Sequence, residues 1–150
     1  MSLEIYTNII TLDSFSYEIS KHSESVILTI HSQIEDDKTK LGRFDASISY
    51  RDKKEYYFDY IGHAHSRKTP ALYGILLGLA KLKRSISLVV FLDLSIYTIR
   101  NPKDREIYDQ IERMAEKKGV SSLTIIGVQD GETKIRECSI EPQKTRKKRA

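Results

Sequence analysis

Residues 69–101 have the sequence TPALYGILLGLAKLKRSISLVVFLDLSIYTIRN, and this stretch decides the fold class. Thr69 at a cap position and Pro70 at the first helical position predict the start of a helix. Apolar side chains follow at helical spacing, and Gly74 and Gly78 add a small-residue ridge suited to close packing on a sheet. Leu88–Leu92 is then an apolar run typical of a buried strand. A buried helix followed closely by a buried strand indicates an α/β domain.

Three strands are predicted on the amino-terminal side of this stretch. Val26–Ile30 is apolar on both faces and predicts a central strand. Glu35–Lys38 is predicted to be a charged turn. Arg43–Arg51 and the aromatic Glu55–Ile61 predict two further strands, joined by a tight polar turn into a hairpin.

The alternation within Arg43–Arg51 predicts a half-buried strand. Phe44 and Ala46 should face the core together with the other apolar residues of the run. Asp45 and Ser47 should face the other way.

On the carboxyl-terminal side, Asn101 and Pro102 repeat the cap-and-proline signal for a second helix, and Gly119 ends it. Leu123–Val128 predicts a last strand, and Thr133–Ile140 a further short element. The order β–β–β–α–β–α–β predicts a mixed sheet, with antiparallel hairpin strands plus parallel strands and helices packed on its faces.

Length and composition indicate one globular domain. The chain has 150 residues, of which 39% are apolar and 31% charged, a mixture that argues against a disordered or a membrane protein. We expect a domain at 25–141, an N-terminal extension at 1–24 with possible short strands, and a basic disordered tail at 142–150. The start has no secretory signal, and the lone Cys138 fits a reducing compartment, so a cytoplasmic, intracellular protein is expected.

The positive charge is concentrated at the carboxyl terminus. The formal net charge is +4, but five of the 25 basic residues lie within 144–149, so the rest of the chain has 20 basic against 21 acidic residues. A near-neutral body argues against a broad nucleic-acid surface, whereas the tail could contact RNA, DNA or an RNA–DNA hybrid in a salt-dependent way. The alternative is a solvated terminus that keeps the protein soluble. The predicted nucleic-acid-binding residues are Lys144, Arg146, Lys147, Lys148 and Arg149.

Over Ser25–Ile140 the order and spacing of these elements resemble ribonuclease H and its retroviral relatives. The best local match is residues 69–101, where Ser95, Ile96 and Tyr97 match the family's S-x-Y after its fourth strand. The resemblance implies a ribonuclease H-like mixed sheet. It also implies a metal-dependent nuclease, provided that the family's acidic residues are present.

Those acidic residues are missing from the expected positions. The family clusters about four carboxylates around two magnesium ions. In this chain the first strand has Thr-Ile-His-Ser at residues 29–32, where the family has its first carboxylate. The position of the helix carboxylate is occupied by Ala71, and that of the fourth-strand carboxylate by Leu94. Asp93 is one residue away, and such a shift points a strand side chain to the opposite face unless a bulge re-aims it. The region that is normally V-x-G-H is Val128–Gly131 without a histidine. We therefore expect a non-catalytic domain that acts as a nucleic-acid-binding or assembly module, with no catalytic residue and no cofactor.

Two other functions remain open. The first is an RNA–DNA hybrid nuclease that uses displaced carboxylates such as Asp93, Glu35 or Asp36 with Mg²⁺ or Mn²⁺. Asp93 lies inside an apolar strand, so if buried it needs a partner. The second is a structural protein–protein module, such as a homo-oligomer formed through an exposed sheet edge; no membrane partner is expected.

Two weaker patterns concern metal binding and aromatic stacking. His63 and His65 would share a face if they lay on a strand, and with a third ligand such as His31 they could bind zinc; a polar strand end is the simpler interpretation. The hairpin also carries a cluster of tyrosines that could stack on the bases of a single strand or pack across strands. These are Tyr50, Tyr56, Tyr57 and Tyr60.

Overall fold

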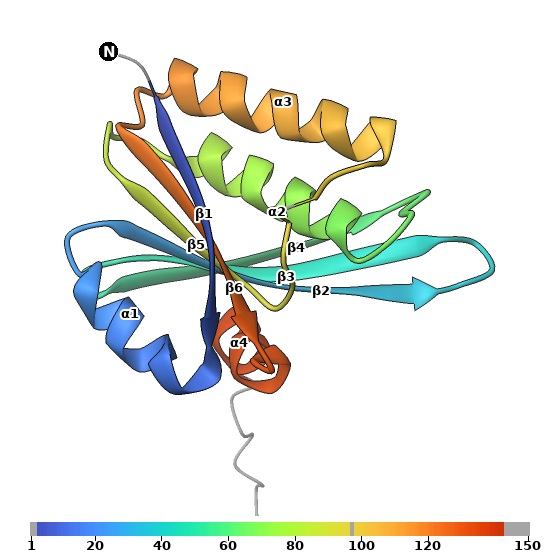
Figure 1. The fold of residues 1–150 in the computed structure, drawn as a ribbon, viewed down its shortest axis with the longest axis horizontal. Helices are drawn as coiled ribbons and strands as arrows, with labels where there is room; N and C mark the ends of the chain where they lie inside the picture. The colour runs from blue at the N-terminus through green and yellow to red at the C-terminus, as the bar shows by residue number, and fades with distance from the viewer. Residues whose placement is uncertain (1–2, 97, 143–150) are drawn as a thin grey trace, which may run out of the picture.

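Six strands form one mixed sheet in the computed structural model, which describes residues 3–96 and 98–142 (Figure 1). Their order across the sheet is β1-β6-β5-β2-β3-β4. β2, β3 and β4 are antiparallel, β5 is parallel to β2, and β6 is parallel to both β5 and β1. The predicted combination of antiparallel hairpin strands and parallel strands is therefore confirmed. The strands are β1 (Glu4–Thr11), β2 (Val26–Asp36), β3 (Leu41–Tyr50), β4 (Lys53–Ile61), β5 (Leu88–Leu92) and β6 (Ser122–Gln129).

Helices cover both faces of this sheet (Figure 1). α2 (Lys68–Lys81) and α3 (Pro102–Lys117) pack on one face, and α1 (Phe15–Lys21) and α4 (Glu132–Ser139) lie on the other. A short 3-10 turn, η1 (Leu12–Ser14), precedes α1. No helix in the described ranges is long and apolar enough to cross a bilayer. The larger core, beneath α2 and α3, includes Leu28, Ile30, Phe44, Leu72, Ile75, Leu79, Val90, Ile111 and Leu123, and the smaller one, beneath α1 and α4, consists of Phe15, Val89, Phe91, Ile126, Val128 and Ile135.

The start of α2 differs from the prediction. The helix begins at Lys68, and Thr69 makes no cap hydrogen bond because its hydroxyl is used elsewhere. The buried Thr69 Oγ1 donates to Asp104 Oδ1 at 2.8 Å and accepts from the backbone N–H of His65 at 3.2 Å. The threonine therefore links α2 to α3 instead of capping its own helix.

The limits of α3 follow the sequence signals. The Asn101 side chain accepts from the backbone N–H groups of Lys103 and Asp104 at 2.9 and 3.3 Å, and Pro102 is the first helical residue. Gly119 follows the helix with φ of +73°, a conformation that glycine adopts without steric cost.

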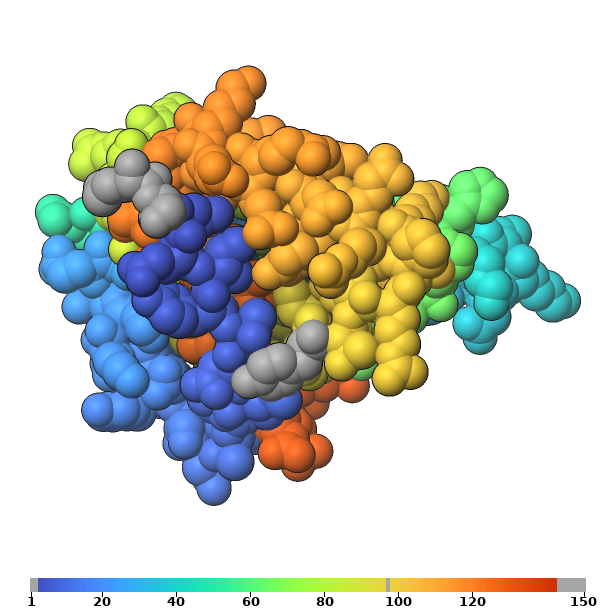
Figure 2. Space-filling view, turned by 45° about the horizontal axis from the view of Figure 1, so that its top comes forward, coloured from blue at the N-terminus to red at the C-terminus, as the bar shows by residue number. Residues whose placement is uncertain are grey.

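The amino-terminal residues belong to the same sheet as the rest of the chain. Glu4–Thr11 is one continuous strand rather than two short ones, and it pairs with β6 along its whole length. Phe15 of α1 then packs edge-to-face on Phe91 of β5, with ring centroids 5.2 Å apart. The space-filling view shows β1 next to α3 on one face of the molecule (Figure 2).

The tip of the β2–β3 hairpin also differs from the prediction. β2 continues through Asp36, so Glu35 and Asp36 lie at the end of a strand and the turn comes after them. This tip protrudes together with the loop after β4 (Figure 2). The N–H of Ala64 in that loop donates to the carbonyl of Lys40 at 2.8 Å, which ties the two segments together.

The face of β3 that carries Asp45 and Ser47 is more buried than the alternation of apolar and polar residues alone predicted. Asp45 and Ser47 are buried because α4 packs across β2 and β3 on that side. Ser47 Oγ lies 2.6 Å from Thr29 Oγ1 of β2, so both hydroxyls have a partner. Polar side chains on this face are thus enclosed between the sheet and a helix.

Candidate functional site

The buried centre of the candidate site is a close contact between the side chains of His31 and Asp93. His31 lies on β2, and Asp93 directly follows β5, the parallel neighbour in which Leu92 pairs with Ile30. The register therefore brings the two side chains together although 62 residues separate them in sequence. His31 Nδ1 is 2.5 Å from Asp93 Oδ2, and the two side chains are 3% and 0% exposed. The requirement that a buried Asp93 have a partner is met.

Arg67 brings a positive charge to the same carboxylate. It precedes α2, and its Nη2 lies 2.7 Å from Asp93 Oδ2, although its orientation does not complete a hydrogen bond there. Its Nε donates to the carbonyl oxygen of Ser32 on β2 at 2.9 Å. The same Nη2 lies 3.8 Å from Glu132 Oε1 at the start of α4. The guanidinium group of Arg67 therefore lies between two carboxylates that come from different elements.

The second ring nitrogen of His31 lies next to a row of polar side chains on β2. His31 Nε2 is 3.3 Å from Gln33 Oε1, and Gln33 Nε2 donates to Glu35 Oε1 at 3.0 Å. Both ring nitrogens of His31 thus lie within hydrogen-bond distance of a side-chain oxygen. Glu35, one of the candidate displaced carboxylates, is exposed at the outer end of this chain of contacts.

The residues of this cluster do not fit a pair of magnesium ions. One ligand atom each from His31, Asp93 and Glu132 lies within 4.8 Å of the others. Two hard divalent cations side by side need more than two carboxylates, however, even when water completes their coordination, and in this cluster only Asp93 and the exposed Glu132 offer carboxylates. Asp93 Oδ2 already faces two nitrogen groups, and a metal ion near it would be repelled by the charge of Arg67.

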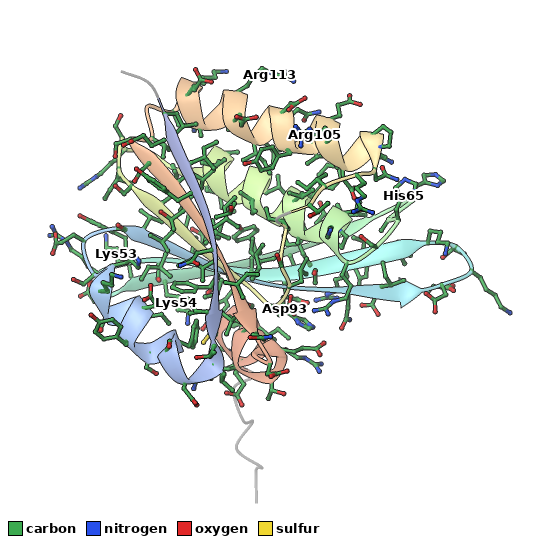
Figure 3. All side chains as sticks on the ribbon, in the orientation of Figure 1. Lys53, Lys54, His65, Asp93, Arg105 and Arg113 are labelled. Atoms are coloured by element: carbon green, nitrogen blue, oxygen red, sulfur yellow. The ribbon has the colours of Figure 1, made fainter. Side chains whose placement is uncertain are left out.

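The other predicted site residues lie outside this cluster, and Figure 3 shows His65 well apart from Asp93. His63 and His65 are in the loop after β4, where His63 has φ of +57°, so they do not lie on a strand and do not share a strand face. Asp36 accepts from the backbone N–H of Lys38 at 2.9 Å, which stabilises the hairpin turn. Tyr97 and the predicted nucleic-acid-binding residues Lys144, Arg146, Lys147, Lys148 and Arg149 lie outside the described residues.

Sequence reasoning missed Arg67 and Glu132. Each is a single charged residue next to a helix start, without a motif around it. Only the packing of α2 and α4 against the ends of β2 and β5 brings them to Asp93. We find no signal in the sequence that would have selected them.

A second feature, which we call the hairpin face, lies on the outer side of β3 and β4. It consists of Arg43, Tyr56, Phe58 and Tyr60, whose register places them on the same side of the sheet as His31. Phe58 and Tyr60 are 58% and 48% exposed. The guanidinium carbon of Arg43 lies 4.5 Å from the centre of the Phe58 ring and 5.0 Å from that of Tyr60.

Asp45 holds Arg43 in this position. Arg43 Nε and Nη2 donate to the two carboxylate oxygens of Asp45 at 3.0 and 2.8 Å, and Nη1 donates to Tyr60 Oη at 2.6 Å. The hydrogen bonds with Asp45 raise the pKa of Arg43 above its ordinary value, although desolvation opposes this. Tyr57, between the exposed aromatics, points the other way and donates to the Gly74 carbonyl at 2.8 Å. Within the tyrosine cluster, the half-buried Tyr57 therefore faces α2, whereas Tyr60 is exposed on the hairpin face.

Comparison with known proteins assigns no family to this chain. No protein-family model matches it. No curated protein matches it in sequence. Its chemistry is therefore inferred from its own residues.

Proposed function

We propose that this chain is a non-catalytic, ribonuclease H-like nucleic-acid-binding module that binds single-stranded segments on the hairpin face. The carrying observation is the pair of exposed aromatic rings, Phe58 and Tyr60, fixed by Arg43. The sheet, in which an antiparallel hairpin is followed by parallel strands, supports the ribonuclease H-like part of the proposal.

The arrangement around Asp93 supports the absence of catalysis. A two-metal nuclease needs several free carboxylates, because each metal ion must be held while it activates water or stabilises the leaving oxygen. Here the buried carboxylate is already in contact with the His31 ring and with the positively charged Arg67. The cluster instead fixes the ends of β2, α2 and β5 relative to one another.

The hairpin face supports nucleic-acid binding through stacking. Bases stack on aromatic rings with little dependence on sequence, and each such contact contributes about 1–3 kcal/mol. Ordered rings lose little conformational freedom on binding, and Arg43 restricts both Phe58 and Tyr60. Because Arg43 is itself neutralised by Asp45, the platform supplies stacking rather than phosphate binding.

Phosphate contacts would come from neighbouring cations. Lys54, on the same strand, lies with its Nζ 5.3 Å from the centre of the Tyr56 ring. The five basic residues of 144–149 follow α4, which packs on β2 and β3 beside the hairpin face. Binding should therefore weaken steeply as salt increases, with a slope set by the number of phosphates contacted.

The test is fluorescence anisotropy of a labelled single-stranded oligonucleotide at several salt concentrations. We expect the double variant Phe58→Ala/Tyr60→Ala to bind at least about tenfold more weakly, since it removes two stacking contacts. Replacing all five basic residues of 144–149 by glutamine should weaken binding and flatten its salt dependence. Tyr17→Ala is the matched control, because Tyr17 is a 67% exposed aromatic on α1 that is not part of the hairpin face.

Two outcomes would contradict the proposal. Equal binding by the Phe58/Tyr60 double variant and by Tyr17→Ala would exclude stacking on the hairpin face. Cleavage of an RNA–DNA hybrid with Mg²⁺ or Mn²⁺ that is stopped by EDTA and lost in Asp93→Asn would instead establish the nuclease alternative.

A further inference from the structure

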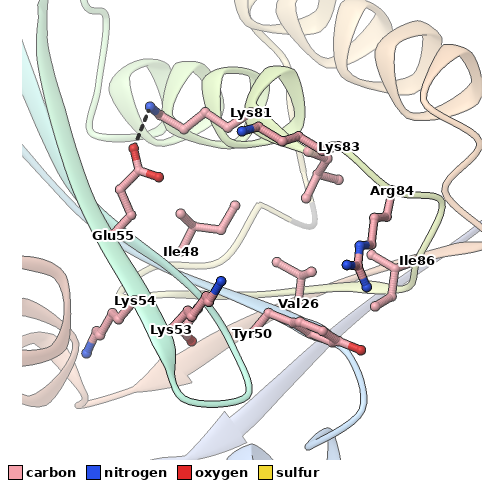
Figure 4. A pocket seen from close by; sticks show the side chains of 12 residues that line it. Val26, Ile48, Tyr50, Lys53, Lys54, Glu55, Lys81, Lys83, Arg84 and Ile86 are labelled. Atoms are coloured by element: carbon pink, nitrogen blue, oxygen red, sulfur yellow. Dashed lines mark hydrogen bonds and ion pairs between the residues drawn. The ribbon is translucent and has the colours of Figure 1, made fainter.

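A groove of about 560 Å³ opens at the start of β2, and it combines an apolar floor with a basic rim (Figure 4). Its floor contains the buried Val26 and Leu82 and the half-buried Ile48 and Ile86. The groove lies between the β3–β4 turn and the segment that joins α2 to β5. Its volume falls within the range of about 300–1,000 Å³ that is typical of small-molecule sites.

Most of the charge on the rim is not neutralised. Five of the lining residues are basic (Lys53, Lys54, Lys81, Lys83 and Arg84), and the acidic one, Glu55, pairs with Lys81 at 3.2 Å. No ion pair within the described part of the chain involves Lys53, Lys83 or Arg84. Figure 4 shows Lys53 and Arg84 on opposite sides of Val26 and Tyr50.

The negative end of α2 does not cancel this charge. The carbonyl groups at a helix C-terminus repel anions when they are free. Here Lys118 Nζ donates to the carbonyl oxygens of Ala80 and Leu82, both at 3.0 Å. An anion in the groove would therefore meet the cations of the rim without opposition from the helix end.

We propose that this groove binds a small amphipathic anion, a phosphate monoester that carries an apolar chain. Lys53, Lys83 and Arg84 would hold the phosphate group, and the aliphatic floor would bury the chain. A phosphate monoester fits better than a single carboxylate because its greater charge matches several cations. A nucleotide fits less well, because the floor is mainly aliphatic and Ser49 is its one neutral hydroxyl apart from the phenol of Tyr50.

The test compares two probes by isothermal titration calorimetry on the full chain: methyl phosphate, which has only the head group, and decyl phosphate below its micelle concentration. Each fully buried methylene group should tighten binding about fourfold. We therefore expect decyl phosphate to bind more than about tenfold more tightly than methyl phosphate. Burial of only two methylene groups of the decyl chain is enough to give this difference. Equal affinities, or no binding of either probe, would overturn the proposal without any variant being needed.

Variants locate the binding in the groove. Lys53→Ala/Arg84→Ala should weaken decyl phosphate at least about tenfold, because two charge-assisted contacts are lost. Arg113→Ala removes a charge from an exposed residue of α3 and should alter the affinity for decyl phosphate by less than about twofold. Lys53 and Arg84 are not part of the hairpin face. The effect of Phe58→Ala/Tyr60→Ala on oligonucleotide binding therefore does not bear on this proposal. An unchanged affinity in the double lysine–arginine variant would overturn it, as would displacement of decyl phosphate by the oligonucleotide.

A vesicle experiment separates two sources of the same chemistry. Phosphatidylcholine vesicles with and without phosphatidic acid are sedimented with the wild-type chain and with Lys53→Ala/Arg84→Ala. Binding that requires phosphatidic acid and is lost in the variant would identify the head group of a lipid as the ligand. Binding of decyl phosphate without vesicle binding would identify a free phosphate monoester, and both results support the groove as the site.

Discussion

Replacing Arg67 by methionine tests whether this residue compensates the buried charge of Asp93. The variant keeps much of the aliphatic volume but removes the guanidinium group, whose Nη2 is 2.7 Å from Asp93 Oδ2 and whose Nε donates to the Ser32 carbonyl. Breaking a buried ion pair by removing one partner costs about 3–5 kcal/mol. The Arg67 side chain is 36% exposed, and His31 stays beside Asp93, so the expected loss is smaller, about 2–3 kcal/mol in the free energy of unfolding.

Urea unfolding followed by far-ultraviolet circular dichroism measures this loss, since the chain has no tryptophan for fluorescence. The same substitution is repeated in an Asp93→Asn background. There it should cost only about 1 kcal/mol, mostly from the lost hydrogen bond to the Ser32 carbonyl.

Two comparisons make the experiment decisive. Arg113→Met, an exposed arginine on α3, should change stability by less than about 0.5 kcal/mol. Glu132→Gln should also cost little, because its contact with Arg67 is 3.8 Å long and Glu132 is 62% exposed. If Arg67→Met resembles Arg113→Met, or costs the same with and without the Asp93 charge, the assignment of Arg67 as the compensating cation is refuted.

Three further substitutions probe the fold. Burial raises the pKa of Tyr57 above the value of about 10 that a tyrosine has in the unfolded chain. The contribution of Tyr57 to the free energy of unfolding is therefore complete below about pH 10 and is lost as the pH rises from there through the raised pKa. Tyr57→Phe should therefore cost about 1 kcal/mol at neutral pH, because the hydrogen bond to the Gly74 carbonyl is lost. Between about pH 10 and 11 the stability of the variant should decline less than that of the wild type, which urea unfolding at each pH would show. Gly78→Ala should destabilise the fold by about 1–3 kcal/mol in the same assay, because the added Cβ would lie 2.6 Å from Tyr57 Oη and 2.7 Å from a methyl carbon of Leu28. Asn101→Ala removes the cap of α3 and should lower the thermal midpoint by the equivalent of about 1 kcal/mol, measured by circular dichroism; an unchanged midpoint would show that the cap is dispensable.

The strand and helix pattern was readable because it depends on local periodicity. The apolar run at Leu88–Leu92 and the alternation after Gly42 have few alternatives once burial is required, and the structure has strands at both. Thr69 shows the limit of such reasoning. Its position suits a cap, but a buried hydrogen bond to Asp104 of another helix takes the hydroxyl instead.

The candidate site shows a larger gap between sequence and structure. Asp93 stood out in the sequence because a charge inside an apolar strand needs a partner, and a partner was found. Which residues would be the partners could not be predicted, since His31, Arg67 and Glu132 come from three separate elements. The exposure of Phe58 and Tyr60 likewise depends on how far α4 reaches across the sheet.

By itself the sequence determined the α/β class, the hairpin and the two long helices, because these follow from the spacing of apolar residues along the chain. The tertiary structure alone decided that Asp93 is buried and which side chains contact it, which aromatic rings stay in solvent, and that Lys53 and Arg84 lie on opposite sides of an apolar floor. The physical reason is that periodicity tells which face of an element is buried. The parallel pairing of β2 with β5 and the docking of α2 and α4 determine which distant residues meet there.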